Sequence, residues 1–89
     1  MQKNTIITGA AGGIGLAICD ALLAQQHQVW AVDIDIGPLQ ELAIQYPQHL
    51  HRVALDVSDF KAVNAWLTPV LASHRIDELV CAAGVLQMG

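Results

Sequence analysis

Four glycines fall within the eight residues TGAAGGIG, at positions 8–15, and they separate two segments with different periodicities. The run TIIT at 5–8 is β-branched and ends at a glycine, which is typical of a buried strand. The segment 14–26 has apolar side chains at the spacing of a helix with a wide buried face. Glycine is entropically unfavourable wherever a chain is ordered. This stretch therefore predicts a strand, a tight glycine-rich turn and a helix in immediate succession.

The same alternation continues along the rest of the chain. Further strands are predicted at 28–35, 51–58 and 78–84, and further helices at 37–46 and 59–74. Pro38 suits a helix start, where its missing N–H is not needed. Ser58 is expected to cap the helix 59–74, and Pro69 to kink or split it. Alternating strands and helices indicate a parallel sheet with right-handed crossovers. We therefore expect an α/β fold, a Rossmann-type doubly wound parallel sheet with strand order 3-2-1-4.

The composition narrows the class of protein. Hydrophobic residues make up 54% of the 89-residue chain and charged residues 13%, which excludes a disordered chain. Such an apolar composition suits a parallel sheet that is buried on both faces, or a chain that is part of a larger core. The net charge is −4 and the four cationic residues are scattered, so we expect no nucleic-acid partner. No apolar run approaches the roughly 18 residues of a membrane span, and we expect a cytoplasmic protein without a signal peptide.

The cysteines and histidines give no sign of a metal site. Cys19 and Cys81 lack metal-type spacing, and both are expected to be buried free thiols. The four histidines fall at the ends of predicted elements, and none pairs with another ligand on one helix. We therefore predict no metal.

The position of the glycines between a strand and a helix suits a nucleotide-binding turn. Gly9, Gly13 and Gly15 would allow a positive φ, a close approach of phosphate to the backbone and tight packing of the helix. The N-terminus of the helix adds free N–H groups and the positive end of its dipole. Glycines also serve plain turn geometry, and this structural explanation stays open for the stretch taken alone.

An acid at the end of the second strand supports nucleotide binding. Asp33 follows the last glycine, Gly15, by 18 residues, close to the spacing of about 20 at which a dinucleotide-binding acid bonds the adenosine ribose hydroxyls. A carboxylate there repels a 2′-phosphate, so the predicted cofactor is NAD rather than NADP. Asp35 is an alternative that the spacing does not exclude.

The form T-G-x-x-x-G-x-G at Thr8–Gly15 resembles the short-chain dehydrogenase/reductase family. The resemblance extends over the whole chain. It implies cofactor binding by the glycine-rich turn and by Asp33. It also implies that LDVS places an acid and a backbone group at the adenine ring, and that CAAG lies beside the cofactor ribose. The cofactor-binding residues expected from it are Gly9, Gly13, Ile14, Gly15, Asp33, Asp56, Val57, Ala83 and Gly84.

Two departures from the family pattern stand out. Cys81 and Ala82 replace two asparagines of the N-N-A-G form. The catalytic Ser, Asn and Tyr-x-x-x-Lys of the family have no counterpart, since Tyr46 is followed four residues later by Leu50. The resemblance thus implies that residues 1–89 are the N-terminal NAD-binding part of a single Rossmann domain. From this resemblance we expect the catalytic half to be absent from this chain and no catalytic residue to lie within it.

The segment LVCAAGVLQMG at 79–89 is similar to that of 2,3-dihydro-2,3-dihydroxybenzoate dehydrogenases. This similarity implies NAD-dependent oxidation of a small diol in catecholate siderophore biosynthesis, although Gln87 stands where an arginine is expected. A parent homo-oligomer is expected from the family. Two alternatives remain open at this point: another NAD-linked short-chain alcohol dehydrogenase, and a truncated nucleotide-binding module without catalysis.

Overall fold

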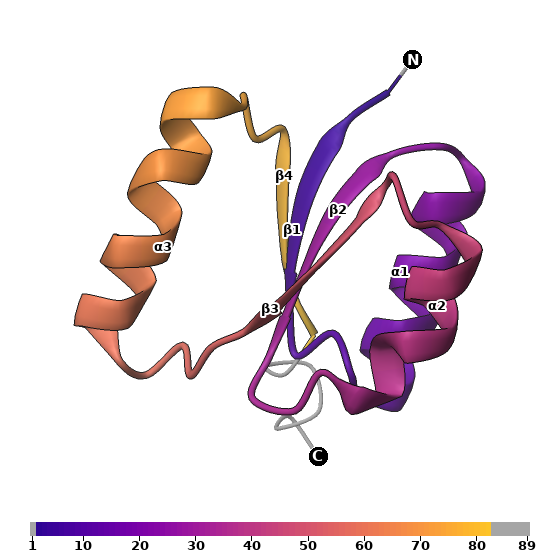
Figure 1. Cartoon of the computed structure of the whole chain (residues 1–89), viewed down its shortest axis with the longest axis horizontal. Coiled ribbons are helices and arrows are strands. Elements are labelled where there is room, and N and C mark those ends of the chain that lie inside the picture. The colour runs from indigo at the N-terminus through magenta and orange to yellow at the C-terminus, as the bar shows by residue number, and fades with distance from the viewer. Residues whose placement is uncertain (1, 83–89) are drawn as a thin grey trace.

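The computed structural model describes residues 2–82 and shows a sheet of parallel strands between helices (Figure 1). The elements follow the order β1 (Asn4–Thr8), α1 (Gly13–Ala24), β2 (Gln28–Asp33), η1 (Gly37–Leu39), α2 (Gln40–Gln45), β3 (Leu50–Ala54), α3 (Phe60–Ser73) and β4 (Glu78–Cys81). The four strands are arranged β3-β2-β1-β4, which confirms the predicted fold class and strand order.

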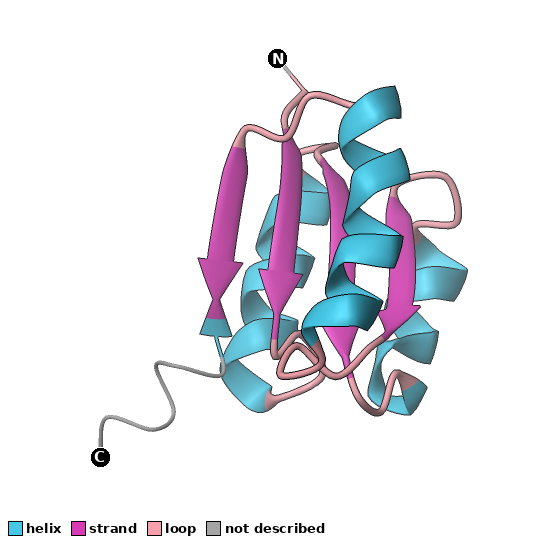
Figure 2. Ribbon diagram, turned by 90° about the vertical axis from the view of Figure 1, so that its left-hand side faces the viewer, coloured by secondary structure: helices cyan, strands magenta, loops and turns pink. Residues whose placement is uncertain are grey.

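The helices lie on both faces of the sheet. Helices α1 and α2 cover one face, and α3 covers the other (Figure 2). Right-handed crossovers explain this division. The chain moves outward from β1 to β2 and β3, then returns past β1 to β4, and the reversed direction transfers the connecting helix to the opposite face.

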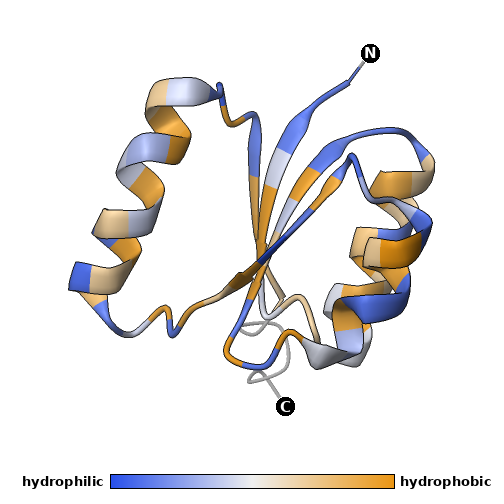
Figure 3. Ribbon diagram, viewed as in Figure 1, coloured by the Kyte–Doolittle hydropathy of each residue, from blue (hydrophilic) through white to orange (hydrophobic). Residues whose placement is uncertain are grey.

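Two apolar cores result, one on each face of the sheet. Residues of β1 and β2 alternate between them, because successive side chains of a strand point to opposite faces. Ile7, Val29 and Ala31 belong to the core under α1 and α2. Ile6, Trp30 and Val32 belong to the core under α3. Figure 3 shows hydrophobic residues in the central parts of the strands and in successive bands along α3. The high apolar content is therefore accounted for by a sheet that is buried on both faces.

Three strands end earlier than predicted: β4 ends at Cys81 rather than at 84, and β2 and β3 end where aspartates bend the chain. Strand β2 ends at Asp33 and β3 at Ala54, whereas the prediction extended them to 35 and 58. Asp35 Oδ1 accepts a hydrogen bond from the Gly37 N–H at 2.9 Å, and Asp56 Oδ1 accepts one from the Ser58 N–H at 2.9 Å. Such local bonds from an aspartate to the backbone two residues on compete with the strand ladder.

The start of α3 also differs from the prediction. The helix is capped by Asp59, whose Oδ1 accepts the Ala62 N–H at 3.2 Å. Ser58, the predicted cap, instead donates its hydroxyl to Asp56 Oδ1 at 2.7 Å. A carboxylate at the cap also suits the positive end of the helix dipole.

Helix α3 is not split at Pro69, which lies inside the continuous helix Phe60–Ser73. Side chains on both sides of the proline pack against the core under α3, among them Trp66, Leu67 and Val70. Burial of these apolar side chains offsets the loss of one helical hydrogen bond at the proline.

The two cysteines have different environments. Cys19 lies on α1 and is fully buried, as predicted, and burial raises the pKa of its thiol to about 11. Cys81 is exposed, so the prediction of a second buried thiol is wrong. Cys81 ends β4, which is an edge strand of the described sheet, and its partner there is Thr8 of β1. No helix within residues 2–82 is long and apolar enough to cross a membrane.

A histidine pair holds the amino end of the sheet against α3. The His51 ring stacks on Trp30 with centroids 4.7 Å apart, and the His74 ring meets Trp30 edge-on at 4.9 Å. His51 Nε2 also hydrogen-bonds Gln28 Oε1 at 2.8 Å. Burial lowers the pKa of His51 from its ordinary value of 6.5, and the nearby charges of His74 and His49 lower it further.

The lowered pKa of His51 predicts that acid weakens the fold. The folded state binds this proton less readily than the unfolded state, so stability from neutral His51 is present above its ordinary pKa. That stability is lost as the pH falls below 6.5 towards the folded-state pKa. The substitution His51→Phe keeps an aromatic ring on Trp30 but does not titrate. We expect the urea midpoint of this variant to fall less than that of the wild type between neutral and mildly acidic pH. Parallel pH profiles for the two proteins would contradict the assignment to His51.

Candidate functional site

The loops that follow β1, β2 and β3 meet at the carboxyl edge of the sheet. Because all the strands are parallel, their carboxyl ends share this edge, which is where open α/β sheets bind ligands. A pocket of about 200 Å³ opens there. We call it the carboxyl-edge pocket, and its lining residues are Gly9, Val32, Asp33, Ile34, Leu55, Asp56 and Val57. Four of the predicted cofactor-binding residues are therefore together in one pocket, contributed by the turn after β1, the last residue of β2 and the loop after β3.

The glycine-rich turn 9–12 connects β1 to α1. Gly9 has a φ of 70°, in the left-handed region that favours glycine. The Gly12 N–H donates to Gly9 O at 3.3 Å, and the Ala10 N–H donates to Val32 O at 3.2 Å. The turn is thus closed on itself and attached to the end of β2.

Gly13 and Gly15 meet different surroundings at the start of α1. A Cβ on Gly15 would lie 2.2 Å from Gly9 O and 2.8 Å from Ala10 Cα, so only glycine lets the helix start against the turn. A Cβ on Gly13 would have no atom within 4 Å, because this position faces open space. Gly15 is thus needed for packing, whereas Gly13 leaves the N-terminus of the helix open to a ligand.

The N-terminus of α1 has features suited to an anion. Gly12 is its N-cap and provides no side-chain hydrogen bond, and the first turn contains no acidic residue. The first N–H groups of a helix have no intrahelical partner and carry the positive end of its dipole. Ile14, predicted to bind cofactor, lies in this first turn and is 41% exposed.

The structure distinguishes the two candidate acids after β2. Asp33 lines the carboxyl-edge pocket, and its Oδ2 accepts the Ala11 N–H at 3.0 Å. Asp33 Oδ1 lies 3.4 Å from the N–H of Asp35. Asp35 is not among the lining residues, and its carboxylate is bonded to the Gly37 N–H. Asp33 is therefore the acid positioned to meet a ligand in this pocket.

Asp56 provides the second carboxylate of the pocket, in the loop after β3. Its Oδ1 accepts both the hydroxyl and the N–H of Ser58, and these bonds hold the pKa of the exposed Asp56 below its ordinary value of 3.8. The group is therefore ionised at neutral pH and acts as a hydrogen-bond acceptor. Val57 follows it and is 47% exposed.

Some site residues were missed by the sequence analysis, and others lie outside the described part of the chain. Three lining residues were not predicted: Val32, Ile34 and Leu55. The signal for each was its place directly beside a predicted acid, Asp33 or Asp56. Ala83 and Gly84, predicted to lie beside the cofactor ribose, fall outside the described residues. Within residues 2–82 no group of three or more His, Cys, Asp or Glu side chains is arranged to hold a metal ion.

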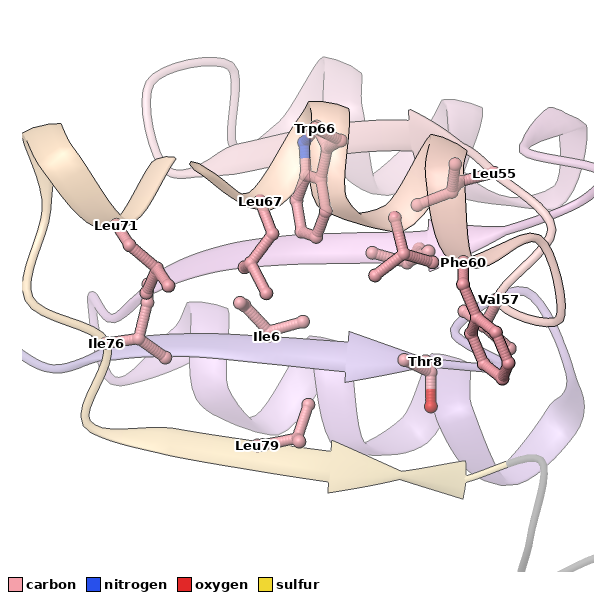
Figure 4. Close-up of a pocket in the computed structure, with 12 residues that line it drawn as sticks. Ile6, Thr8, Leu55, Val57, Phe60, Trp66, Leu67, Leu71, Ile76 and Leu79 are labelled. Atoms are coloured by element: carbon pink, nitrogen blue, oxygen red, sulfur yellow. The ribbon is translucent and has the colours of Figure 1, made fainter. Parts of the chain in front are cut away.

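A larger groove of about 380 Å³ lies between α3 and the strands β1 and β4 (Figure 4). Ile6 and Leu79 point into it from the strands, and Trp66 and Leu67 from the helix. No ionisable side chain is among its lining residues in the described part of the chain. The polar groups needed to orient a dinucleotide are in the carboxyl-edge pocket instead.

Comparison with known proteins agrees with this arrangement. The family model described as short chain dehydrogenase matches residues 3–89. The chain belongs to this family.

Three relatives illustrate the similarity. D-threitol dehydrogenase of Mycolicibacterium smegmatis is 39% identical over 97% of this chain and 35% of its own length. The vibriobactin-specific 2,3-dihydro-2,3-dihydroxybenzoate dehydrogenase of Vibrio cholerae is 32% identical over 99% of this chain and 36% of its own length. A structure of 4-hydroxyisoleucine dehydrogenase complexed with NADH matches 86% of this chain and 32% of its own, with a TM-score of 0.76 and 29% identity. The chain thus spans about a third of the length of these relatives.

The different surroundings of Gly13 and Gly15 predict that one substitution lowers the stability of the fold and the other weakens NAD binding. The substitution Gly15→Ala forces the helix away from the turn, and we expect a loss of about 1–3 kcal/mol in the free energy of unfolding. Gly13→Ala meets no neighbouring atom, so we expect equal or slightly higher stability but weaker NAD binding, because the added methyl group occupies the open approach to the helix N-terminus. Urea denaturation and NAD titration of both variants test this. Equal loss of stability in both would contradict the packing role assigned to Gly15.

Proposed function

We propose that this chain is the NAD-binding N-terminal part of a single Rossmann domain in an NAD-dependent short-chain dehydrogenase. The supporting observation is the carboxyl-edge pocket, in which Gly9, Asp33, Asp56 and Val57 lie beside the open N-terminus of α1. A turn without large side chains, a helix N-terminus and an acid at the end of the second strand are the groups that bind a dinucleotide.

Asp33 is the proposed acceptor for the adenosine ribose hydroxyls. The pocket lining contains two carboxylates, Asp33 and Asp56, and no lysine or arginine. A 2′-phosphate would meet negative charge there without a compensating cation, which favours NAD over NADP. A related dehydrogenase of known structure is complexed with NADH, which is consistent with this choice.

The binding residues for the remaining parts of the cofactor are proposed from where each residue lies in the fold or in the family pattern. Gly13, Ile14 and Gly15 begin α1, whose N-terminus is proposed to bind the pyrophosphate. Asp56 and Val57 are proposed to contact the adenine ring. Ala83 and Gly84 are proposed, from the family resemblance, to lie beside the cofactor ribose. NAD would supply the hydride acceptor, and the described residues would bind and orient it.

For the whole enzyme we propose oxidation of 2,3-dihydro-2,3-dihydroxybenzoate to 2,3-dihydroxybenzoate, a step that belongs to catecholate siderophore biosynthesis. The segment 79–89 supports this substrate, as does the Vibrio cholerae relative that is named for it. The residues that transfer the proton are proposed to lie in a part of the enzyme beyond this chain. A cytoplasmic homo-oligomer is proposed with it. A polyol is the second candidate substrate, because D-threitol dehydrogenase has the higher identity, 39% against 32%.

The cofactor preference provides the direct test of this proposal. We expect the chain to bind NAD at least about tenfold more tightly than NADP in calorimetric titrations, since a 2′-phosphate would face two carboxylates. Asp33→Ala should lower the affinity for NAD more than the affinity for NADP, so the ratio of the two affinities should fall. Equal binding of both cofactors by the wild type would contradict the role of Asp33, and no binding of either would contradict the function.

The substrate proposal is tested separately on the whole enzyme. With 2,3-dihydro-2,3-dihydroxybenzoate and NAD we expect formation of NADH at a kcat/KM at least about tenfold above that for D-threitol. The reverse order would assign the enzyme to the polyol dehydrogenases while leaving the cofactor site unchanged.

A further inference from the structure

The carboxylate of Asp33 is hydrogen-bonded to the glycine-rich turn itself. Asp33 Oδ2 accepts the Ala11 N–H at 3.0 Å, across 22 positions of sequence. The neighbouring Ala10 N–H donates to the carbonyl of Val32 at 3.2 Å. Two consecutive N–H groups of the turn are therefore held by two consecutive residues at the end of β2, the first by a backbone atom and the second by a side chain.

The turn has no side chain of its own with which to hold its conformation. Its four residues are Gly9, Ala10, Ala11 and Gly12, and its internal bond from the Gly12 N–H to Gly9 O is 3.3 Å long. The bond to Asp33 Oδ2, at 3.0 Å, is shorter than this internal bond and has a carboxylate oxygen as its acceptor. Gly12 is also the N-cap of α1, so the position of the turn determines where the first N–H groups of the helix point.

We propose that Asp33 is a positioning residue for the pyrophosphate site, in addition to its role at the ribose. Its Oδ2 fixes the turn through Ala11, and the fixed turn holds the N-terminus of α1 in place for the pyrophosphate. This inference rests on the proposed function and deepens it. One carboxylate then serves both the choice of NAD and the binding of a group that NAD and NADP share.

Inorganic pyrophosphate separates the two roles, because it contains no ribose. If Asp33 acts only on the ribose, truncation of its side chain in Asp33→Ala leaves pyrophosphate binding unchanged or improves it, since one repulsive charge is lost. If Asp33 positions the turn, the same truncation weakens pyrophosphate binding, because the Ala11 N–H loses its acceptor. The two roles therefore predict effects of opposite sign.

The experiment is a titration of the isotope-labelled chain with sodium pyrophosphate, followed by the amide NMR signals of Gly13 and Gly15. For Asp33→Ala we expect affinity to fall about tenfold and the Ala11 amide proton to move upfield, since its charged acceptor is lost. For Asp33→Asn we expect affinity equal to or above that of the wild type, because the amide oxygen still accepts the Ala11 N–H. Asp35→Ala is the matched control: it removes a nearby charge that is not bonded to the turn, and affinity should not fall.

Pyrophosphate affinity in Asp33→Ala that equals or exceeds the wild-type value would overturn the inference. If Asp33→Ala does not fold, Asp33→Leu, which also lacks an acceptor for the Ala11 N–H, takes its place. Loss of pyrophosphate affinity together with an upfield move of the Ala11 amide proton supports the positioning role. Retained pyrophosphate affinity in Asp33→Leu contradicts it. Absence of pyrophosphate binding in the wild type would also overturn the inference. If the wild type binds NAD but not pyrophosphate, the proposed function stands and only the positioning role is contradicted. If it binds neither ligand, both the positioning role and the proposed function are contradicted.

Discussion

Helix α1 starts in direct contact with the turn that follows β1, and the rest of the site depends on this contact. Gly15 lies against Gly9 O and Ala10, where a Cβ would come within 2.2 Å of the carbonyl oxygen. The contact places the N-terminus of the helix at the carboxyl edge of the sheet. Gly9 and Asp33 meet in the pocket beside it because β1 and β2 are neighbouring parallel strands, with Thr8 opposite Val32. If the helix began farther from the turn, its free N–H groups would lie away from the pocket that contains Asp33 and Asp56.

Much of this arrangement could be predicted from the sequence, because the determinants are local and strongly patterned. TIIT followed by glycines, and the longer run QVWAVDID, are short segments rich in apolar residues, and the structure shows a strand at each. Right-handed crossovers then leave few ways to order the strands, and the predicted order 3-2-1-4 is confirmed. The spacing from Gly15 to Asp33 reflects one helix and one strand of fixed rise per residue, which brings the acid to the end of β2 beside the turn.

The wrong predictions have a different origin. They concern features that are decided by competing local hydrogen bonds or by which elements pack over a residue in the folded chain. Asp59 rather than Ser58 caps α3, because the Ser58 hydroxyl is bonded to Asp56. The burial of Cys81 depends on what covers an edge strand, and a run such as ELVC does not encode this. Asp33 is the predicted acid, although spacing alone leaves Asp35 open as an alternative. In the structure Asp33 lines the pocket, while Asp35 is bonded to Gly37. The bond from Ala11 to Asp33 joins two chain segments without any sequence signal of its own.

The most direct measurement is a crystal structure of the chain with NAD. We expect the ribose hydroxyls of the adenosine within hydrogen-bond distance of Asp33, and the pyrophosphate over Gly13 at the N-terminus of α1. NAD bound elsewhere, for example in the apolar groove between α3 and β4, would contradict the assignment of the carboxyl-edge pocket as the cofactor site.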